Sequence, residues 1–459
     1  MNNSEFSSLN LSPALQENLT SLGYLQMTPI QAQSLPLVLE GKDLIAKAKT
    51  GSGKTAAFAL GLLSRLNINR VDVQALVLCP TRELADQVAQ EIRRLARALP
   101  NVKLVTLCGG TPTAPQSATL GFGAHIAVGT PGRILKHLEQ GTLELSSLET
   151  LVLDEADRML DMGFGEDINR VISYAPERRQ TLLFSATYPE GIAQMSRGVQ
   201  RNPVEVSVES LHEGSAIEQK LYEVPAGQRL DALTWLLSHY QPGSCVVFCN
   251  TKRACNDVAD HLAAKGFSAL ALNGDLEQRE RDQVLVRFAN GSATILVATD
   301  VAARGLDIKE LGAVINYELT YDPEVHVHRI GRTGRAGQQG LALSLYQPSE
   351  AQRVNLIEEY QQAPMPLGDL DSIGREIKPI APQMVTLSID AGRKTKVRAG
   401  DILGALTGEG GIAGADVGKI QISEQYSYVA VKRQVASAAL KRLQEGKIKG
   451  RSYRARKLG

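Results

Sequence analysis

A glycine-rich stretch at residues 48–55, Ala-Lys-Thr-Gly-Ser-Gly-Lys-Thr, constrains the fold more than any other feature of the sequence. The short, mostly apolar run at residues 43–46 before it is typical of a buried strand, and residues 56–60 after it favour a helix. Glycines let the backbone N–H groups of such a turn point inward, and the helix start adds positive potential. We therefore predict a phosphate-binding loop. The alternative is a glycine-rich turn that binds nothing, but the strand before it and the Gly-Lys-Thr at the start of a helix favour phosphate binding.

Strand-like and helix-like segments alternate after this loop. Apolar runs typical of buried strands occupy residues 75–79, 104–107, 126–128, 151–153, 181–184 and 204–208. Helical stretches such as residues 83–99 lie between them. A second alternation has strand-like runs at residues 245–249, 269–272, 294–297 and 313–317, but no phosphate loop. This pattern predicts an α/β protein with two doubly wound parallel sheets.

An acidic cluster follows the strand-like run at residues 151–153. Asp154 is placed to hold Mg²⁺ through water, and Glu155 to polarise or position an attacking water. An acidic helix cap is the alternative for this cluster alone. Because parallel sheets bind ligands beyond the carboxyl ends of their strands, we expect the cluster to lie near Lys54 and Thr55. Together these residues predict an enzyme that hydrolyses ATP with Mg²⁺.

Charge is divided unevenly along the chain. The totals of 50 Lys and Arg and 49 Asp and Glu give a net charge of +1, but residues 383–459 hold 15 basic and 6 acidic residues. Residues 1–382 hold the other 35 basic and 43 acidic residues. A basic end on an acidic body predicts a tail that binds a polyanion, with a solvated basic face as the alternative.

The rest of the composition predicts a cytoplasmic protein that does not enter a membrane. No apolar run approaches a membrane span, and residues 1–10 lack the basic start and apolar core of a secretion signal. The five cysteines include no Cys-x-x-Cys pair, and several lie in strand-like runs. Free buried thiols are therefore predicted instead of disulfides or a zinc site.

A series of short motifs, all in one order, resembles a known family. Residues 154–157 spell Asp-Glu-Ala-Asp, and the other motifs are at residues 23–31 (GYLQMTPIQ), 80–84 (PTREL), 109–110 (GG), 130–133 (TPGR), 185–187 (SAT), 246–251 (VVFCNT), 299–307 (TDVAARGLD) and 328–335 (HRIGRTGR). Through them, residues 1–365 resemble the DEAD-box RNA helicases. Met27 stands where that family has proline, but Gln31 is retained. The resemblance implies two RecA-like domains and an RNA-stimulated ATPase.

The resemblance also implies roles for residues in an ATP site. The catalytic residues would be Lys54, Asp154, Glu155, Arg332 and Arg335, with the two arginines stabilising charge on the transferring phosphoryl group. A basic surface turn is the alternative for these arginines. Mg²⁺ would be held by Thr55 and Asp154. The nucleotide contacts would be Phe6 and Gln31 at the adenine, Thr50, Gly51, Ser52, Gly53, Lys54 and Thr55 at the phosphates, and Asp307 at the ribose or phosphate.

RNA contacts in the two parallel-sheet domains follow from the same resemblance. Small hydroxyls, glycine amides and arginines suit binding to phosphates and 2′-hydroxyls without reading bases. The implied residues are Pro80, Thr81, Arg82, Gly110, Thr130, Arg133, Thr251, Arg281 and Thr299.

The segment after residue 382 predicts a small α+β domain that resembles an RRM. Strands at residues 384–389, 419–423, 426–431 and 452–457 and helices at 401–406 and 434–444 give the order βαββαβ. Alternation would expose Tyr426 and Tyr428 on the sheet, although the usual basic residue and first-strand aromatic are absent. Charge must then carry more of the RNA binding, and the predicted RNA contacts of the tail are Arg393, Lys394, Lys396, Arg398, Tyr428, Lys449 and Arg451. A basic anchor without sequence preference is the alternative.

With this tail, the chain is similar to the DbpA group of the family, which recognises a hairpin of 23S ribosomal RNA during large-subunit assembly. We expect a monomeric ATP-dependent RNA helicase that unwinds short duplexes and has a 23S rRNA hairpin and pre-50S particles as partners. An ATP-gated RNA clamp and a DNA helicase are the alternatives. The predicted boundaries are residues 1–208 and 218–365 for the RecA-like domains, 209–217 and 366–382 for linkers, and 383–459 for the RRM-like domain.

Overall fold

The computed structural model describes residues 5–48, 52–186, 190–208, 217–303, 311–334 and 339–458. The chain forms two compact units, which we describe separately: residues 1–211 with 305–307, and residues 212–304 with 308–459. No helix in these ranges is both long and apolar enough to cross a membrane. All five cysteines are buried and free, as the sequence predicts.

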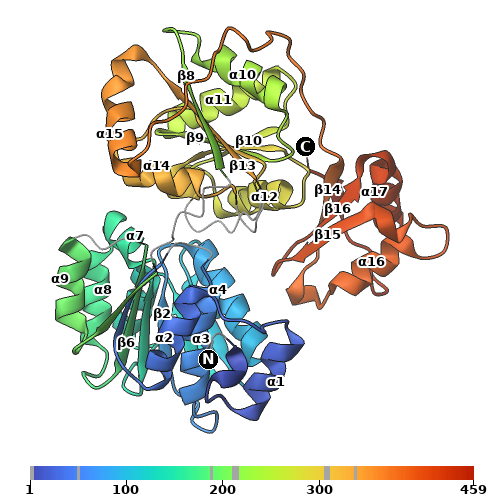
Figure 1. The fold of residues 1–459 in the computed structure, drawn as a ribbon. Helices are drawn as coiled ribbons and strands as arrows, with labels where there is room; N and C mark the ends of the chain where they lie inside the picture. The colour runs from blue at the N-terminus through green and yellow to red at the C-terminus, as the bar shows by residue number, and fades with distance from the viewer. Residues whose placement is uncertain are drawn as a thin grey trace. The chain divides into compact units, whose positions relative to one another are not determined.

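A seven-stranded parallel sheet with the order β3-β4-β2-β5-β6-β1-β7 forms the centre of the first unit (Figure 1). Leu44 and Ala46 enter one hydrophobic core, whereas Ile45 between them enters the other. Strands buried on both faces explain the continuous apolar runs in the sequence. The strands are β1 (Leu44–Lys47), β2 (Ala75–Leu78), β3 (Leu104–Leu107), β4 (Ile126–Gly129), β5 (Thr150–Asp154), β6 (Gln180–Ser185) and β7 (Val204–Ser207).

Helices cover both faces of this sheet. One core contains residues of α1 (Pro13–Ser21), α2 (Pro29–Leu39), α3 (Lys54–Arg65) and α4 (Arg82–Leu95). The opposite core contains residues of α6 (Pro131–Glu139), α7 (Ala156–Asp161), α8 (Gly165–Ser173) and α9 (Glu190–Val199). In contrast, α5 (Thr113–Gly121) has no fully buried residue. The first unit is therefore a doubly wound α/β domain, as predicted.

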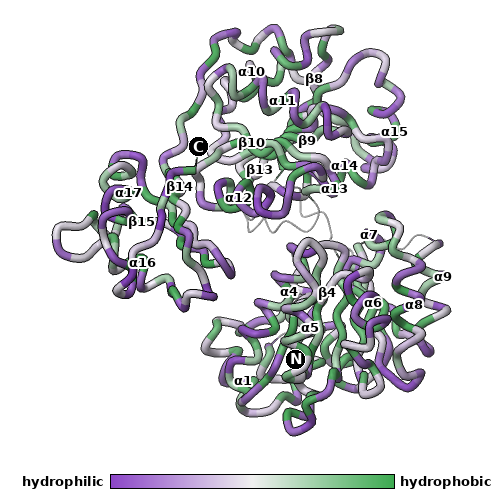
Figure 2. Tube along the Cα trace, turned by 180° about the vertical axis from the view of Figure 1, so that it is seen from behind, coloured by the Kyte–Doolittle hydropathy of each residue, from purple (hydrophilic) through white to green (hydrophobic). Residues whose placement is uncertain are grey.

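The second unit contains a six-stranded parallel sheet with the order β10-β11-β9-β12-β13-β8. Figure 2 shows hydrophobic residues concentrated along its inner strands. The strands are β8 (Ile217–Glu223), β9 (Cys245–Cys249), β10 (Ala269–Leu272), β11 (Ile295–Thr299), β12 (Ala313–Asn316) and β13 (Gly340–Tyr346). The helices are α10 (Arg229–Tyr240), α11 (Lys252–Ala264), α12 (Gln278–Ala289), α13 (Asp300–Ala303), α14 (Pro323–Ile330) and α15 (Ala351–Gln361).

The segment expected to be a linker, residues 366–382, packs against this second sheet. The N–H of Leu221 donates to Pro366 O over 2.8 Å, and the N–H of Gly368 donates to Leu221 O over 2.8 Å, which extends the sheet beyond β8. Ile373 is buried in the core, and the N–H of Lys378 donates to the Ser238 hydroxyl over 3.1 Å. A proline-rich composition suggested a free tether, but the apolar residues within it attach this segment to the domain.

A four-stranded antiparallel sheet with the order β15-β16-β14-β17 completes the second unit. Its core includes Ile402 and Leu406 of one helix and Ala439 and Leu443 of the other. The elements are β14 (Met384–Ile389), α16 (Ala399–Thr407), β15 (Val417–Ile422), β16 (Ser427–Lys432), α17 (Ala436–Glu445) and β17 (Ala455–Lys457). The predicted βαββαβ order, and with it the predicted fold class, is confirmed.

Candidate functional site: a phosphate loop and RNA-facing loops

The phosphate loop lies between β1 and α3, as the sequence predicts. Gly53 caps α3 with a left-handed backbone (φ 92°), and a Cβ atom here would lie 2.5 Å from Gln31 Nε2. Glycine is therefore required for both backbone conformation and close approach. The next residue, Lys54, is buried, and within the described part of the chain its ammonium has no hydrogen-bond partner. The predicted residues Thr50 and Gly51 lie outside the described residues.

Two carboxylates follow β5 at its carboxyl end. Asp154 is 2 % exposed, and its Oδ1 has no hydrogen-bond partner among the described residues. Burial raises the pKa of this carboxyl to about 7, and the neighbouring Lys54 ammonium opposes the shift. Glu155 begins α7 with a left-handed backbone (φ 53°), a rare conformation that recurs at functional sites. Its Oε2 lies 3.3 Å from Arg158 Nη1.

This chemistry fits a magnesium nucleotide. An orphaned buried carboxylate oxygen at Asp154 suits a hard cation, and the unpartnered ammonium of Lys54 suits phosphate oxygens. In the described ranges, no three His, Cys, Asp or Glu side chains are grouped to hold a metal. Mg²⁺ at Asp154 and Thr55 would therefore need further oxygens from the nucleotide and from water.

Gln31 is buried and ties the start of α2 to the phosphate loop. Its Oε1 accepts from the N–H of Thr28 over 2.8 Å, and its Nε2 donates to Gly53 O over 3.0 Å. Thr28 Oγ1 also donates to Ser52 O over 2.7 Å. Gln31 therefore orients the phosphate loop, and its contact with adenine stays a prediction.

Phe6, the other predicted adenine contact, is 2 % exposed. Its ring meets that of Tyr24 edge-on, with 5.7 Å between the centroids. Both residues line a cavity of about 290 Å³ together with Gln26. The stacking role of Phe6 stays a prediction.

In the first unit, the predicted RNA contacts gather at one edge of the sheet. They follow the carboxyl ends of β2, β4 and β3, which are neighbours. Thr81 caps α4 by accepting from the N–H of Leu84 over 3.3 Å, and Arg82 lies 3.8 Å from Asp86. Gly110 has a left-handed backbone (φ 77°), and Thr130 precedes α6. The three loops with Pro80–Arg82, Gly110 and Thr130–Arg133 thus lie side by side.

The second unit repeats this arrangement. Thr251 follows β9 and caps α11 through the N–H of Ala254 (3.1 Å), while Thr299 ends β11, the neighbour of β9. Arg281 on α12 donates to Ala302 O over 2.7 Å, which fixes that helix near the end of β11. Of the predicted ATP contacts, Arg332 is 8 % exposed just after α14. Arg335 and Asp307 lie outside the described residues.

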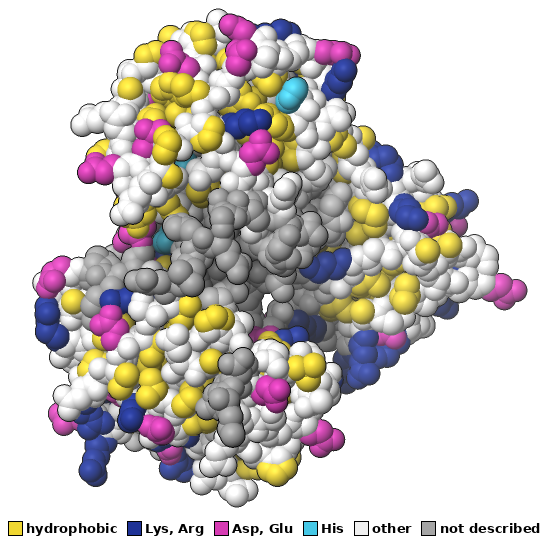
Figure 3. All heavy atoms as spheres, viewed as in Figure 1, with side chains coloured by type: hydrophobic (Ala, Val, Ile, Leu, Met, Phe, Trp, Pro, Cys, Tyr) yellow, Lys and Arg dark blue, Asp and Glu magenta, His cyan; other side chains and the backbone are white. Residues whose placement is uncertain are grey.

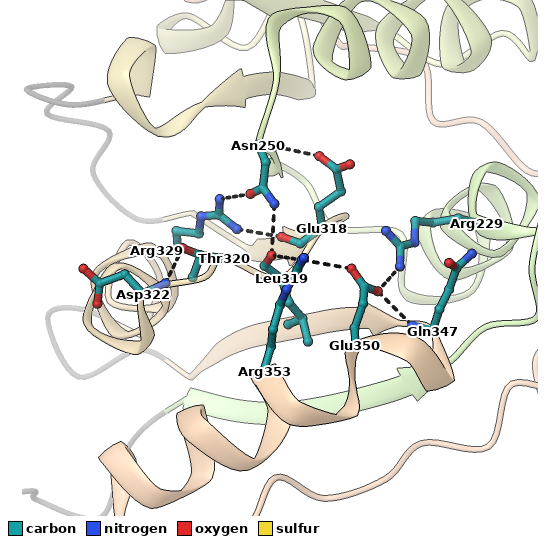
Figure 4. A network of polar contacts seen from close by, with 10 residues as sticks. All are labelled: Arg229, Asn250, Glu318, Leu319, Thr320, Asp322, Arg329, Gln347, Glu350 and Arg353. Atoms are coloured by element: carbon teal, nitrogen blue, oxygen red, sulfur yellow. Dashed lines mark hydrogen bonds and ion pairs between the residues drawn. The ribbon is translucent and has the colours of Figure 1, made fainter.

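Arg329 is a buried residue that the sequence analysis did not assign (Figure 4). Its Nε and Nη2 each donate to an oxygen of Asp300 over 2.7 Å. Nη2 also donates to Asn250 Oδ1 over 2.9 Å, and Nη1 donates to Asn316 Oδ1 over 3.3 Å and to Glu318 O over 2.8 Å. All five guanidinium N–H groups are therefore used. His326, Arg329 and Ile330 share the buried face of α14, and this spacing could have identified Arg329 from sequence.

In the C-terminal domain, the expected exposure of Tyr428 is wrong. Tyr428 is 2 % exposed, because residues of α12 cover this part of the sheet. Burial raises the pKa of its hydroxyl, which Gln283 contacts by a hydrogen bond. The guanidinium of Arg279 lies 4.5 Å from the ring centroid of Tyr426. Tyr428 is therefore not an open stacking platform, and the ring of half-buried Tyr426 is in contact with Arg279.

A polar contact between the turn after α12 and the first strand of that sheet accompanies this coverage. The buried hydroxyl of Thr386 bonds to Asn290 Nδ2 over 2.8 Å and to Ser292 Oγ over 2.8 Å. The absence of an aromatic residue at position 386, which seemed a departure from an RRM, leaves room for this contact. Threonine here binds protein in place of RNA.

The predicted basic residues of this domain come from two segments that meet. Lys449 Nζ donates to Lys396 O over 3.0 Å, which joins residues 393–398 to residues 449–451. Lys394 is exposed and lies 3.8 Å from Glu424. Figure 3 shows Lys and Arg side chains on the visible face of this domain. The two basic segments therefore form one surface, which we call the tail basic surface: Arg393, Lys394, Lys396, Arg398, Lys449 and Arg451.

Comparisons with known proteins give consistent results along the whole chain. Residues 28–195 match the DEAD/DEAH box helicase family, residues 228–337 the helicase conserved C-terminal domain, and residues 386–457 the DbpA RNA binding domain. The chain is 58 % identical over 454 residues to the ATP-dependent RNA helicase DbpA of Escherichia coli K12, covering 99 % of both chains. It is 35 % identical to the ATP-dependent RNA helicase DeaD of Mycobacterium tuberculosis, covering 97 % and 92 % of the two chains.

A solved structure shows the same fold. Saccharomyces cerevisiae Dbp5 bound to RNA and ADP BeF3 is 31 % identical and matches with a TM-score of 0.73, covering 80 % of this chain and 96 % of that one.

Proposed function

Because this chain belongs to the DEAD-box family of ATP-dependent RNA helicases, we propose that it opens short RNA duplexes in 23S ribosomal RNA during assembly of the large ribosomal subunit. It uses ATP and binds RNA, and it carries a DbpA-type RNA-binding domain. The observation that supports this substrate is the match of residues 386–457 together with 58 % identity over 99 % of the chain to a DbpA protein. The proposal includes action as a monomer in the cytoplasm, on pre-50S particles.

In the proposed mechanism, the first unit holds the nucleotide. The ammonium of Lys54 binds the outer phosphates as a point charge, and backbone N–H groups at the start of α3 add positive potential. Thr55 and Asp154 would hold Mg²⁺, which would supply neutralising charge to the phosphates when bound. Glu155 accepts a hydrogen bond from the attacking water and orients it. Arg332 and Arg335 stabilise the charge that develops on the transferring phosphoryl group.

RNA is proposed to be bound in two ways. The loops with Thr81, Gly110, Thr130, Thr251 and Thr299 hold a strand through phosphates and 2′-hydroxyls, without reading its bases. The tail basic surface supplies the contacts that select the ribosomal hairpin, and these contacts are sensitive to salt. Selectivity then belongs to the tail and strand opening to the two parallel-sheet domains.

The experiment combines ATPase and strand-displacement assays on the full chain. A 23S rRNA fragment with its hairpin and a short adjoining duplex is compared with an unrelated hairpin of equal length. We expect the ribosomal fragment to stimulate ATP hydrolysis at lower concentration and its duplex to be displaced. Equal stimulation by both RNAs would refute the substrate, and stimulation without displacement would show an ATP-gated clamp instead.

A charge reversal separates the tail from the rest of the molecule. Lys394→Glu changes the exposed part of the tail basic surface, whereas Lys441→Glu reverses an exposed charge on α17, in the same domain but within a different ion pair. We expect only Lys394→Glu to reduce the preference for the ribosomal fragment. Such a variant is a better test than removal of residues 383–459, because removal would uncover the turn at Asn290 that contacts Thr386.

A further inference from the structure

Gln116 on α5 has a side chain whose hydrogen-bonding capacity is completely used. Its Nε2 donates to Cys108 O over 3.0 Å and to Thr111 Oγ1 over 3.1 Å. Its Oε1 accepts from Arg133 Nη1 over 2.9 Å and lies 3.0 Å from His137 Nε2. An amide has two N–H groups and two lone pairs, so these four contacts leave none unused.

These four contacts tie together the loops that follow two neighbouring strands. Cys108 and Thr111 lie in the loop after β3, and Arg133 lies in the first turn of α6, after β4. Arg133 also joins the two loops directly, because its Nη2 donates to Thr111 O over 2.8 Å. The spacing between Gly110 and Thr130 is thus set by side chains as well as by the sheet.

His137 fixes the orientation of the amide from the other side. It is buried, and burial lowers the pKa of its imidazole, with further lowering by Arg133 and Lys136. A neutral ring that donates from Nε2 to Gln116 leaves Nδ1 to accept from the Thr142 hydroxyl, 2.8 Å away. Because Arg133 can only donate, the Gln116 oxygen must face it, and the amide cannot be reversed.

The same arrangement holds the guanidinium of Arg133 in place while using only some of its N–H groups. Gln116 and Thr111 accept two of its five N–H groups, and the residue is half-buried. The other three N–H groups suit phosphate oxygens of a bound strand. A guanidinium held by two fixed acceptors loses less side-chain freedom when it binds than a free one.

We propose that Gln116 is a positioning residue for RNA binding, which sets the distance between the loop with Gly110 and the loop with Thr130–Arg133. This inference rests on the proposed function, since it takes those loops as RNA contacts. Gln116 itself need not touch RNA. A role in stabilising the core is disfavoured, because α5 contributes no fully buried residue and Gln116 is only half-buried.

The test compares two variants in α5 of the full-length protein. Gln116→Met keeps the length of the side chain and removes all four contacts. Thr119→Ala removes only the bond from that exposed hydroxyl to Pro115 O, within the same helix. Because the hydrogen bonds that set the loop spacing are lost, we expect Gln116→Met to raise the RNA concentration for half-maximal ATPase about tenfold. The KM for ATP at saturating RNA should not change, and Thr119→Ala should behave as the unmodified chain.

A second variant keeps the inference testable if Gln116→Met folds poorly. Gln116→Glu keeps the acceptor for Arg133 and His137 but loses both donors to the loop after β3. We expect a smaller rise in the RNA requirement than for Gln116→Met, again at constant KM for ATP. An unchanged RNA requirement in both variants, or an equal rise in the KM for ATP, would overturn the inference. Absence of RNA stimulation in the unmodified chain would instead refute the proposed function.

Discussion

The guanidinium of Arg329 and the carboxylate of Asp300 form a two-point ion pair, with Nε–Oδ1 and Nη2–Oδ2 distances of 2.7 Å. The arginine side chain is 1 % exposed and the aspartate 23 %. The pair joins α14, which precedes Arg332, to the end of β11, which carries Thr299. Nη2 of Arg329 also donates to Asn250, the residue before Thr251. The buried guanidinium of Arg329 therefore links the proposed RNA contacts Thr251 and Thr299 to the helix before Arg332, a proposed ATP contact.

We predict that Arg329→Lys will lower RNA-stimulated ATPase at least about tenfold. Lysine has a single compact ammonium and cannot reach the five acceptors that a planar guanidinium satisfies. Loss of a buried partner also destabilises a domain by about 3 kcal/mol. ATPase assays check the first effect, and urea unfolding followed by Trp235, the only tryptophan, checks the second in the same unit.

The control for this variant is Arg253→Lys, at an exposed arginine of α11 paired loosely with Asp257. It should leave both measurements unchanged. Normal stimulation in Arg329→Lys would show that the buried pair does not support the activity.

A pH effect on stability is predicted from His326. Its imidazole is fully buried on α14, and neither ring nitrogen has a hydrogen-bond partner in the ranges that the structure describes. Burial, with a contribution from Arg329, lowers its pKa from 6.5 to about 4. The unfolded chain therefore takes up a proton at higher pH than the folded chain. The contribution of neutral His326 to the free energy of unfolding is present above pH 6.5 and is lost as the pH decreases towards 4. At pH 5 the free energy of unfolding is lower by about 2 kcal/mol.

Urea unfolding at pH 7 and pH 5, again followed by Trp235, measures this effect. In His326→Phe, which keeps a ring of similar size, the part of the pH dependence due to His326 should disappear. His239→Phe, at an exposed histidine of α10, is the matched control and should retain it. If His326→Phe lost as much stability between pH 7 and pH 5 as the unmodified chain, the assignment of the pH effect to His326 would be contradicted.

The parts of the fold that could be predicted correctly from the sequence are those tied to a local pattern. Strand period and the glycine turn at Gly53 are dictated by neighbouring residues, so the α/β order and the position of the phosphate loop could be predicted. The spacing on α14 indicates that Arg329 is buried, but the roles of Arg329 and Gln116 could not be predicted. These roles depend on which loops and strands the fold brings together around each side chain. Alternation along residues 426–431 could not show that α12 covers Tyr428, because the covering residues come from another domain.

The burial of Tyr428 leads to a prediction about RNA binding by the tail. Stacking on a base contributes about 1–3 kcal/mol, so loss of a stacking ring would weaken binding at least fivefold. Because α12 already covers Tyr428, we expect Tyr428→Leu to change affinity for the ribosomal hairpin less than threefold. Lys394→Glu should weaken it and reduce the dependence of log Kd on log salt concentration by about one unit. RNA titrations at several salt concentrations measure the affinity of each variant and its salt dependence. A loss of affinity of about fivefold or more with Tyr428→Leu would show that this ring does stack on a base.

Glu155→Gln tests the role of the second carboxylate in hydrolysis. Glutamine has the same shape and can adopt the same backbone at φ 53°, and the proposed Mg²⁺ ligand Asp154 is unchanged. ATP binding should therefore remain within a few-fold of that of the unmodified chain. The neutral amide cannot polarise the attacking water, so turnover should fall at least about a hundredfold. Fluorescent-nucleotide binding and ATPase assays separate the two effects, with Glu149→Gln, in the exposed pair with Arg70, as the control. Weak binding together with slow turnover would assign Glu155 to the nucleotide site as a whole, and normal turnover would remove it from the mechanism.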